Sequence, residues 1–356
     1  MNDPRIRSLV GVGVGAALLL LVLGVLVGST GWLDLRAGFF GPAQDVAQAA
    51  TLQQIIWDIR LPRTAGAWAA GALLGLAGAV AQGVFRNPLA DPYLLGSASG
   101  ASLGVVLVLA ALGAAGEGAG DMDGTGALHV FSGGLGLRLG LTGAAFAGAV
   151  LAVLLTLLLA RGVGHTLRLL LAGVVVGVVL AALTQMVLLF SPEAMPAMQA
   201  FMLGSTAFVG WTSCGLMAGV WLLCWLLAWL LSRVLDGLSL GDATALSLGL
   251  PVAPMRAALV AVLALATGTA VAQTGLIAFV GLAAPHLVRS LVKTTHAPLM
   301  LLSSLAGGVL LMAADILARS LLAPQELPVG VLTAVVGGGY LLWRMHRGNQ
   351  QAAGAL

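Results

Sequence analysis

The segment LLLAGVVVGVVLAALTQMVLLF, residues 169–190, contains no charged side chain along its whole length. An α-helix rises about 1.5 Å per residue, so a helix of this length crosses the roughly 30 Å hydrocarbon core of a bilayer. The sequence therefore predicts an all-α polytopic membrane protein with a single transmembrane domain over residues 1–356. Apolar segments of similar length predict ten spans, near residues 8–28, 64–83, 94–113, 139–160, 169–190, 211–231, 257–273, 275–292, 299–318 and 329–344.

The composition supports this class. Hydrophobic residues make up 60% of the chain and charged residues only 8%, whereas a soluble domain carries about 25% charged residues. The mean hydropathy is +1.05. A transmembrane barrel would show short segments of alternating hydrophobicity, and the sequence has none. The 50 glycines suit helices that pack closely in a membrane.

The basic residues predict the orientation. An even number of spans places both termini on one side of the membrane. With both termini in the cytoplasm, most Arg and Lys residues fall at cytoplasmic ends, as the positive-inside rule requires. The basic residues that fall outside are Arg36, Arg60, Arg63, Arg138 and Arg319. The net charge of +3 therefore reflects membrane topology, and we expect no nucleic-acid partner.

One polar insert interrupts the apolar segments, LSLGDATALSLGL at residues 238–250 within a longer loop of about 236–254. It carries Asp242 near its start and small residues throughout. It ends at Gly249, which stops helices, followed by Pro251. The predicted topology places it in the cytoplasm. We interpret it as a helical docking element for a soluble partner; the alternative is an ordinary loop helix without a partner.

Several kinds of catalytic site are excluded by missing residues. The only lysine is Lys293, so no GxxxxGK[ST] phosphate-binding loop exists. No HExxH pattern is present. An intramembrane enzyme would need clustered ionisable groups at mid-depth, and the strong candidate there is Asp315. With Arg319 four residues later, Asp315 is better explained by a helix ion pair. We expect no enzyme activity and no bound cofactor or metal.

The loops and short motifs add further expectations. Residues 114–137 are rich in Gly and predict a flexible external loop; its acidic residues and histidine lack the tight spacing of a metal site. Residues 191–210 predict a partly helical external or re-entrant element. Cys214 and Cys224 lie ten residues apart in one span, too far for a disulfide, and are expected to be packing residues. Pro285 predicts a helix break.

The motifs together resemble those of the permease subunits of bacterial type II ABC importers, the family that takes up vitamin B12, ferric siderophores and haem. The resemblance covers most of residues 55–345, and its motifs stand in the family's order. The motifs are RLPRT at 60–64, GALLGLAGAVAQGVFRNPLADPYLLGSASGA at 71–101, RLLLAG at 168–173, LSLGDATALSLGLP at 238–251, GLIAFVGLAAPHLVR at 275–289, ADILAR at 314–319 and ELPVGVLTAVVGG at 326–338. The loop at 114–137 is longer and richer in Gly than the family would suggest.

The resemblance implies a ten-helix permease that acts as a homodimer in the bacterial inner membrane. Two soluble ATPase subunits, which bind ATP and Mg, would sit at its cytoplasmic face, and a binding protein would dock on the periplasmic face. The insert would form short coupling helices that contact the ATPase. The residues that match this contact are Leu240, Gly241, Asp242, Ala243, Ala245, Leu248 and Gly249. Asp242 is also a candidate N-cap.

Two further sites follow from the same resemblance. Arg60, Arg63 and Arg319 match arginines that receive acidic side chains from the binding protein, a contact that suits the planar guanidinium fork. The alternative is that they reach lipid headgroups at the interface. His165 and Thr166, in the loop before the fifth span, match the cytoplasmic gate, although this loop departs from the Ser- and Thr-rich gate of the B12 permease.

The cargo is the least determined property. A weakly polar path lined by Gly, Ala and Leu suits a bulky, partly apolar iron chelate. Overall likeness to haem permeases makes haem the leading expectation, with ferric siderophore and vitamin B12 as alternatives. A secondary transporter, which would need no ATPase, is the alternative from a different class.

Overall fold

The computed structural model describes residues 3–28, 31–32, 46–114, 135–163 and 166–340. Its first half contains α1 (Pro4–Leu26), the short strands β1 (Val27–Gly28) and β2 (Gly31–Trp32), α3 (Val46–Gln54), the π-helical turn η1 (Ile55–Arg60), α4 (Leu61–Phe85), α5 (Ser97–Ala114), α7 (Leu135–Leu159) and α8 (Thr166–Phe190). The second half contains η2 (Pro192–Ala194), α9 (Met195–Leu203), α10 (Trp211–Leu230), α11 (Ser232–Ser239), α12 (Asp242–Ser247), α13 (Val252–Thr274), α14 (Val280–Leu291) and α15 (His296–Ser320). An apolar helix at Val329–Tyr340 follows.

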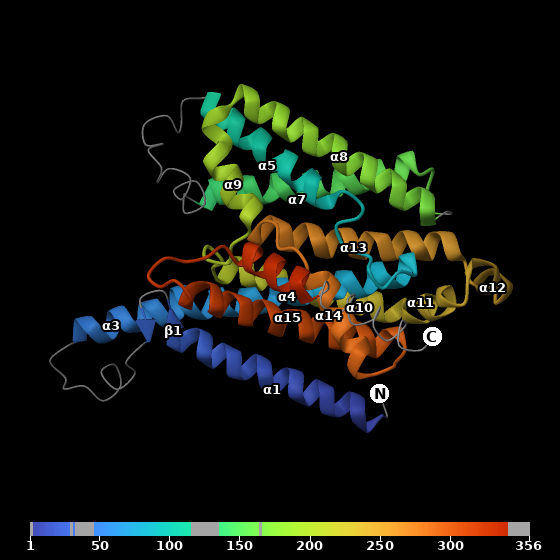
Figure 1. The fold of residues 1–356 in the computed structure, drawn as a ribbon, viewed down its shortest axis with the longest axis horizontal. Helices are drawn as coiled ribbons and strands as arrows, with labels where there is room; N and C mark the ends of the chain where they lie inside the picture. The colour runs from blue at the N-terminus through green and yellow to red at the C-terminus, as the bar shows by residue number, and fades with distance from the viewer. Residues whose placement is uncertain (1–2, 29–30, 33–45, 115–134, 164–165, 341–356) are drawn as a thin grey trace, which may run out of the picture.

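The long helices form two groups that lie along each other (Figure 1). One group consists of α5, α7 and α8, which pack on one another. The other surrounds α4, which packs on α10, α13, α14 and α15, while α1 lies outermost against α15. The contact of α13 with α7 joins the two groups. Because α4 is covered on all sides, nearly every side chain from Pro62 to Phe85 is buried.

Close backbone approach along α4 explains its run of small residues. A methyl group on Gly75 would overlap the carbonyl oxygen of Ser303 in α15. One on Gly78 would overlap the carbonyl oxygen of Gly281 in α14. Helices in lipid gain little from burying apolar side chains against one another, so they associate through such close contacts. The glycines of α4 therefore set its distance from α14 and α15.

The predicted spans are confirmed as helical segments, but they differ in length. The described residues contain seven helices that are long and apolar enough to cross a membrane. The predicted spans near 94–113 and 329–344 correspond to the shorter apolar helices Ser97–Gly113 and Val329–Tyr340. The span predicted near 275–292 is partly wrong: residues 275–279 are not helical, and α14 has only 12 residues. A helix of that length rises about 18 Å, less than a bilayer core.

Two non-helical segments meet inside the bundle. The segment 86–96 lies between α4 and α5, and the segment 275–279 lies between α13 and α14. The Tyr93 hydroxyl donates to the carbonyl oxygen of Ile277 at 3.1 Å. Phe279 has a left-handed φ of +68°, which is unusual for a bulky residue. Non-helical backbone at membrane depth occurs where it is buried in protein or lines a cavity, so this meeting point is a candidate for function.

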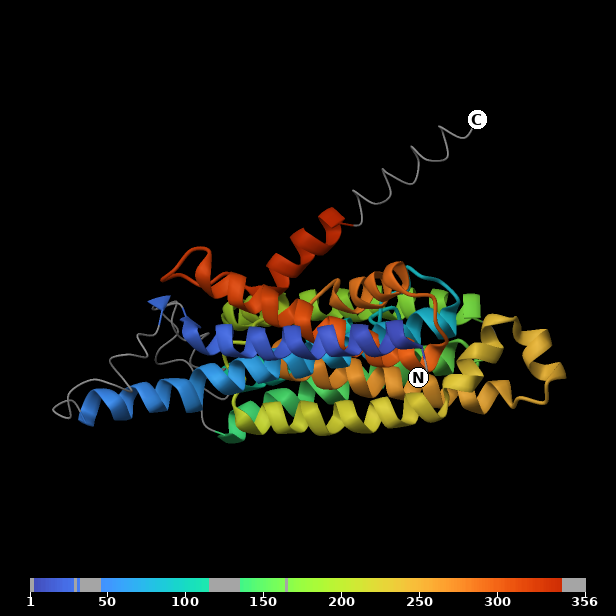
Figure 2. The ribbon, with the colours of Figure 1, turned by 90° about the horizontal axis from the view of Figure 1, so that it is seen from below.

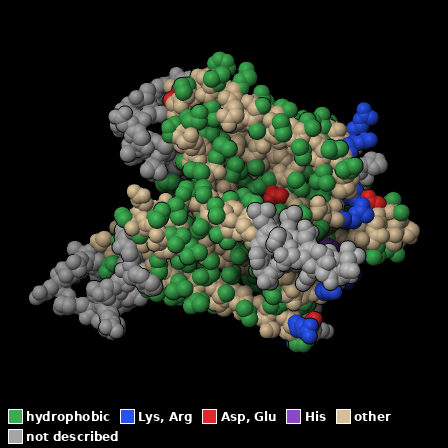
Figure 3. Space-filling model, in the orientation of Figure 1, with side chains coloured by type: hydrophobic (Ala, Val, Ile, Leu, Met, Phe, Trp, Pro, Cys, Tyr) green, Lys and Arg blue, Asp and Glu red, His purple; other side chains and the backbone are tan. Residues whose placement is uncertain are grey.

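The polar insert lies at one end of the molecule. Helices α11 and α12 protrude beyond the bundle (Figure 2), and α1 begins at that same end (Figure 1). We call this the insert end. The opposite end, where Arg60, Arg63 and Arg319 lie, is called the arginine end. On the face drawn in Figure 3, hydrophobic side chains cover the length of the helices, and Lys and Arg side chains gather at the insert end. The sequence analysis likewise placed most Arg and Lys residues at one end of the predicted spans, the end that carries the polar insert.

Pro285 does not break a helix, contrary to the sequence-based interpretation. It lies inside α14, which runs continuously from Val280 to Leu291. Proline has no N–H to donate to the carbonyl four residues earlier, which here belongs to Gly281. That carbonyl faces Gly78 of α4, so α14 tolerates the proline where the neighbouring helix approaches closely.

Two other expectations are confirmed. Residues 191–210 are partly helical, with η2 and α9 followed by a non-helical stretch. Cys214 and Cys224 are buried, free cysteines packed in α10. The predicted Gly-rich loop at 114–137 lies mostly outside the described residues. Of its residues, only 114, at the end of α5, and 135–137, at the start of α7, are described.

Candidate functional site

The N-terminus of α12 is held by arginines from two other helices. Asp242 is the first residue of α12, after Gly241, whose φ is +106°. The N-cap position is thus occupied by Gly241, which has no side chain, and Asp242 lies one residue inside the helix. Asp242 Oδ1 accepts from Arg256 of α13 at 2.9 Å and lies 3.2 Å from Nη2 of Arg86, at the end of α4. The predicted capping role is therefore wrong, because the carboxylate turns back toward α4 and α13.

The outer surface of α12 and its flanks is apolar. Leu240, Leu246 and Leu248 are 64%, 60% and 63% exposed. They lie on the part of the chain that protrudes beyond the bundle (Figure 2). We call these three residues the leucine patch. Large apolar side chains that are exposed together mark surfaces that contact other proteins or the membrane. Leu246 was not among the predicted docking residues. It lies three residues after Ala243, a helical spacing that places it on the same face and could have identified it.

The predicted docking residues divide into two sets. Leu240, Ala243, Leu248 and Gly249 are exposed, and Gly241 and Asp242 are partly exposed. Ala245, by contrast, is completely buried in the core. Ala245 therefore lies on the inner face of α12, and its direct contact with a partner stays a prediction that would require α12 to move.

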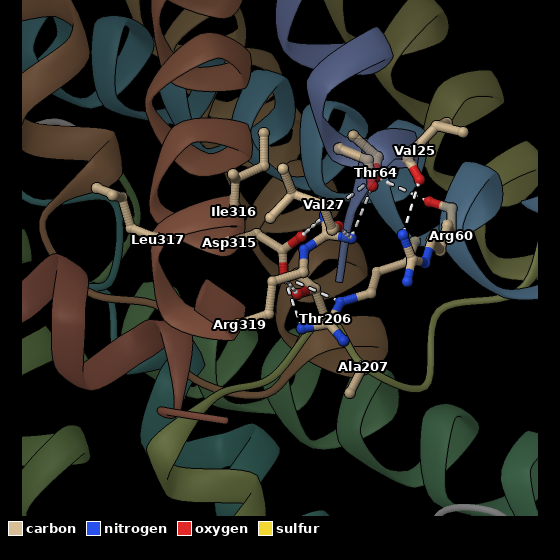
Figure 4. A network of polar contacts seen from close by, with 12 residues as sticks. Val25, Val27, Arg60, Thr64, Thr206, Ala207, Asp315, Ile316, Leu317 and Arg319 are labelled. Carbon is tan, nitrogen blue, oxygen red and sulfur yellow. Dashed lines mark hydrogen bonds and ion pairs between the residues drawn. The ribbon is translucent and has the colours of Figure 1, made fainter. Parts of the chain in front are cut away.

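At the arginine end, a buried charge cluster centres on Asp315 of α15. Nε and Nη2 of Arg63 donate to Asp315 Oδ1 at 3.0 and 2.9 Å. Nη1 of Arg63 donates to both carboxylate oxygens of Glu326, at 3.0 and 2.9 Å. The Thr206 hydroxyl also donates to Asp315 Oδ1 (Figure 4). The fork of Arg63 thus joins two carboxylates, one fully buried and one partly exposed.

Arg319 completes this cluster. Its Nη2 donates to Asp315 Oδ2 and, at 3.0 Å, to the hydroxyl of Thr64 in α4. Its Nη1 donates to the carbonyl oxygen of Gly24 at 3.0 Å. The predicted ion pair between Asp315 and Arg319, four residues apart, is confirmed. The cluster therefore ties α1, α4, α15 and the segment before α10 into one unit.

Arg60 holds the end of α1. Its Nη1 donates to the carbonyl oxygens of Val25 and Leu26, both at 3.0 Å. The last carbonyls of a helix lack partners within the helix, and a cation near them is favourable. This interaction fixes the C-terminus of α1 against the start of α4.

The three arginines predicted to receive a binding protein are thus engaged inside the chain. Arg60, Arg63 and Arg319 are only 6%, 8% and 1% exposed. Their contacts with protein carboxylates, carbonyls and a hydroxyl leave no support for contact with lipid headgroups. Docking of a binding protein on them stays a prediction, and it would require their present partners to give way.

The predicted gate is described only in part. His165 lies outside the described residues, whereas Thr166 is the first residue of α8. Val163 is the last described residue before the gate; it is buried, and its carbonyl oxygen accepts a hydrogen bond from Arg256 at 2.8 Å. The described residues contain no group of three or more His, Cys, Asp or Glu placed to hold a metal ion.

Cavities open beside the non-helical segments, and two of them are the larger ones. The first, of about 420 Å³, runs along α8; we call it the Asp91 cavity. Its lining is Asp91, Tyr93, Leu94, Gly96, Ser99, Gly173, Val174, Gly177, Val178 and Ala181. The second, of about 300 Å³, lies between α14, α15 and the helix at 329–340, and its lining is largely apolar and includes Phe279. Interrupted helices next to cavities are where membrane transporters build their cargo sites.

Comparison with known proteins agrees with this architecture. The family model of the FecCD transport family matches residues 10–347. The vitamin B12 import system permease protein BtuC of Salmonella schwarzengrund (strain CVM19633) is 37% identical over 305 residues, 84% of this chain and 86% of the relative. BtuC of Salmonella paratyphi A (strain ATCC 9150 / SARB42) is 38% identical over the same shares.

Solved structures show the same fold. A metal-chelate type ABC transporter in an inward-facing conformation superimposes with a TM-score of 0.76 and 28% identity, covering 95% of this chain and 99% of that one. PsaBC from Streptococcus pneumoniae, in complex with Fab, matches with a TM-score of 0.51 and 21% identity, covering 78% and 88%. The chain belongs to the FecCD transport family, the permeases of ABC importers whose ATPase is a separate subunit.

Proposed function

We propose that this permease imports a vitamin B12-type corrinoid. The observation that carries the proposal is the 37–38% identity, over 84% of the chain, to permeases named for vitamin B12 import. This replaces haem, the leading expectation from the sequence, with one of its alternatives. The haem and the corrinoid interpretations share the broader function of an importer permease for a chelate or B12-type cargo.

The charge of the Asp91 cavity supports a neutral cargo. Asp91 is the acidic residue in its lining, and the remaining side chains are small, apolar or neutral. Haem carries two propionate carboxylates, which the Asp91 carboxylate in the lining of this open cavity would repel. A corrinoid instead carries peripheral amides, whose N–H groups can donate to such a carboxylate. The cavity therefore favours an amide-rich chelate over an anionic one.

We propose further that the insert end faces the cytoplasm and that the leucine patch docks the ATPase. The Lys and Arg side chains gathered at that end support this orientation under the positive-inside rule. The working unit would be a homodimer of this chain in the inner membrane, with two ATPase subunits. A periplasmic binding protein would deliver the cargo at the arginine end.

Reconstituted transport tests the proposal. The permease is placed in proteoliposomes with the ATPase and binding protein encoded beside it, and uptake of cyanocobalamin, haemin and a ferric hydroxamate is measured. We expect ATP-dependent uptake of cyanocobalamin, abolished with a hydrolysis-deficient ATPase. Haemin uptake without cobalamin uptake would restore haem as the cargo. ATP-independent uptake by the permease alone would make it a secondary transporter.

A further inference from the structure

Arg256 links the insert to a distant part of the fold. It lies in the first turns of α13, and its side chain is completely buried. Nη2 donates to Asp242 Oδ1, in α12, at 2.9 Å. Nη1 donates to the carbonyl oxygen of Val163, in the connection between α7 and α8, at 2.8 Å. One guanidinium group thus contacts α12 through Nη2 and the residues before α8 through Nη1.

A second arginine provides an internal comparison. Arg86 also pairs with Asp242 Oδ1, at 3.2 Å, but its side chain is 37% exposed and it comes from the end of α4. Exposed ion pairs contribute little to stability and can rearrange in water. The two arginines therefore share one carboxylate, and Arg256 is the one that is buried and also contacts Val163.

The burial of Arg256 makes its link stiff. A buried charge that loses its carboxylate partner is left unpaired in a medium of low dielectric, which is strongly unfavourable. If α12 moves, Arg256 is therefore expected to follow Asp242. The carbonyl of Val163 would then either follow Arg256 or lose its donor. The backbone next to Val163 already turns sharply, with left-handed φ values at Arg161 (+55°) and Gly162 (+89°).

The far side of this link leads to a helix that lines the Asp91 cavity. Helix α8 begins at Thr166 and supplies Gly173, Gly177 and Ala181 to the lining of the Asp91 cavity. A displacement of the α7–α8 connection would therefore act on the helix that forms one wall of that cavity. The chain of contacts runs from the leucine patch through Asp242 and Arg256 to Val163, three residues before α8 begins.

We propose that Arg256 is a coupling residue, which transmits the displacement of α12 by the ATPase to the start of α8. It acts through its two hydrogen-bonded neighbours and touches neither ATP nor cargo, so its role is positioning. The proposal rests on the proposed docking of the ATPase at α12. Its loss should separate ATP hydrolysis from transport without releasing the ATPase.

The first test compares two matched variants, Arg256→Met and Arg86→Met. Each removes one arginine from Asp242 and keeps an unbranched apolar side chain. The permease, ATPase and binding protein are reconstituted together, and cargo molecules moved per ATP hydrolysed are measured. We expect Arg256→Met to retain the ATPase and its hydrolysis while this ratio falls about fivefold or more, the lower range of coupling between sites. Arg86→Met should change the ratio less than about twofold.

A parallel change in both variants, or an unchanged ratio in Arg256→Met, would overturn the proposal. If the ATPase fails to bind even the parent permease, the docking proposal fails and the coupling role, which rests on it, fails with it; an unchanged ratio with the ATPase bound overturns the coupling role alone. Should Arg256→Met not fold, Arg256→Lys keeps the charge opposite Asp242 but lacks the second arm of the fork. A ratio equal to that of the parent in Arg256→Lys would also count against the proposal.

A distance measurement gives a readout independent of activity. Spin labels are placed at Ser247→Cys in α12 and Arg168→Cys in α8, both exposed, after Cys214 and Cys224 are replaced by alanine. In the otherwise unchanged permease, the label-to-label distance should stay constant between the nucleotide-free and ATP-bound complexes, since the two segments move together. With Arg256→Met it should change. A distance that changes equally in both proteins would contradict a rigid link.

Discussion

Arg63 and Asp315 lie 252 residues apart in the chain and form a buried ion pair in which two guanidinium nitrogens donate to one carboxylate oxygen. The pair joins the start of α4 to the end of α15 at the arginine end. Asp315 is completely buried and also receives Arg319 and Thr206. A single buried carboxylate therefore pairs with two cationic side chains where α1, α4 and α15 meet, and Glu326 supplies the second negative charge.

Replacing Asp315 should be among the most destabilising changes in this chain. Asp315→Asn leaves Arg63 and Arg319 facing each other without the shared carboxylate, and breaking a buried pair in this way typically costs about 3–5 kcal/mol. We expect a clear fall in the thermal midpoint of the permease in detergent. The control is Glu326→Gln, because the Glu326 side chain is 30% exposed and its pair should contribute about 1 kcal/mol or less. Equal losses in the two variants would show that the cluster does not depend on Asp315.

The close approach of α4 and α14 predicts a second effect. Gly78→Ala places a methyl group against the carbonyl oxygen of Gly281. The helices must then separate, at a cost of about 1–3 kcal/mol for overpacking. Gly143→Ala in α7 is the matched control, since nothing lies within 4 Å of its added methyl group. That control should leave the thermal midpoint unchanged or raise it slightly, because alanine is the better helix former. A stable Gly78→Ala protein would contradict the packing described here.

The leucine patch predicts a loss of binding without a loss of folding. Leu246→Asp puts a charge in the middle of the proposed ATPase contact, and a hot-spot residue near the centre of an interface is worth about 2 kcal/mol or more. We expect the ATPase to be lost during co-purification while the thermal midpoint of the permease is retained. Ser247→Asp introduces the same charge at the next exposed residue of α12 outside the patch and should weaken binding less. Normal co-purification of Leu246→Asp would place the docking surface elsewhere.

Two neighbouring alanines of α12 should respond in opposite ways to added bulk. Ala245 is completely buried, so Ala245→Leu should destabilise the insert by about 1–3 kcal/mol through overpacking. Ala243 is exposed, so Ala243→Leu should leave the fold intact and act on ATPase binding alone. Thermal unfolding and ATPase binding, measured on both variants, separate the two effects. If Ala245→Leu proved as stable as the parent, α12 would not pack as described.

The carboxylate of the Asp91 cavity predicts a change in cargo preference. Asp91→Asn removes the negative charge and keeps the size of the side chain, so uptake of anionic haemin should rise relative to cobalamin. A shift of about fivefold or more is expected, because like charges about 4 Å apart repel by roughly 1–4 kcal/mol between bulk water and a protein surface. Asp58→Asn, in η1 and outside the cavity, is the control. An unchanged preference would mean that the cargo does not pass Asp91.

Short-range patterns explain why much of the fold could be predicted. An apolar run must span the membrane as a helix, since backbone N–H and C=O groups have no other partners in lipid. The insert was recognisable because polar residues are rare in this chain, and the pairing of Asp315 with Arg319 followed from helical spacing alone. The leucine patch was only partly found, because Leu246 becomes distinctive only once α12 is seen to protrude.

The sequence by itself determined the membrane class, the positions of the helices, the missing nucleotide site and the place of the polar insert, because each follows from composition or from residues close together in the chain. The tertiary structure alone decided which way Asp242 and Ala245 face, that Pro285 fits within α14, and that residues 275–279 interrupt a predicted span. It also decided that Arg63 meets Asp315 and that Arg256 reaches Val163. These depend on contacts between segments tens to hundreds of residues apart, which arise only when the helices pack and leave buried polar groups to find partners.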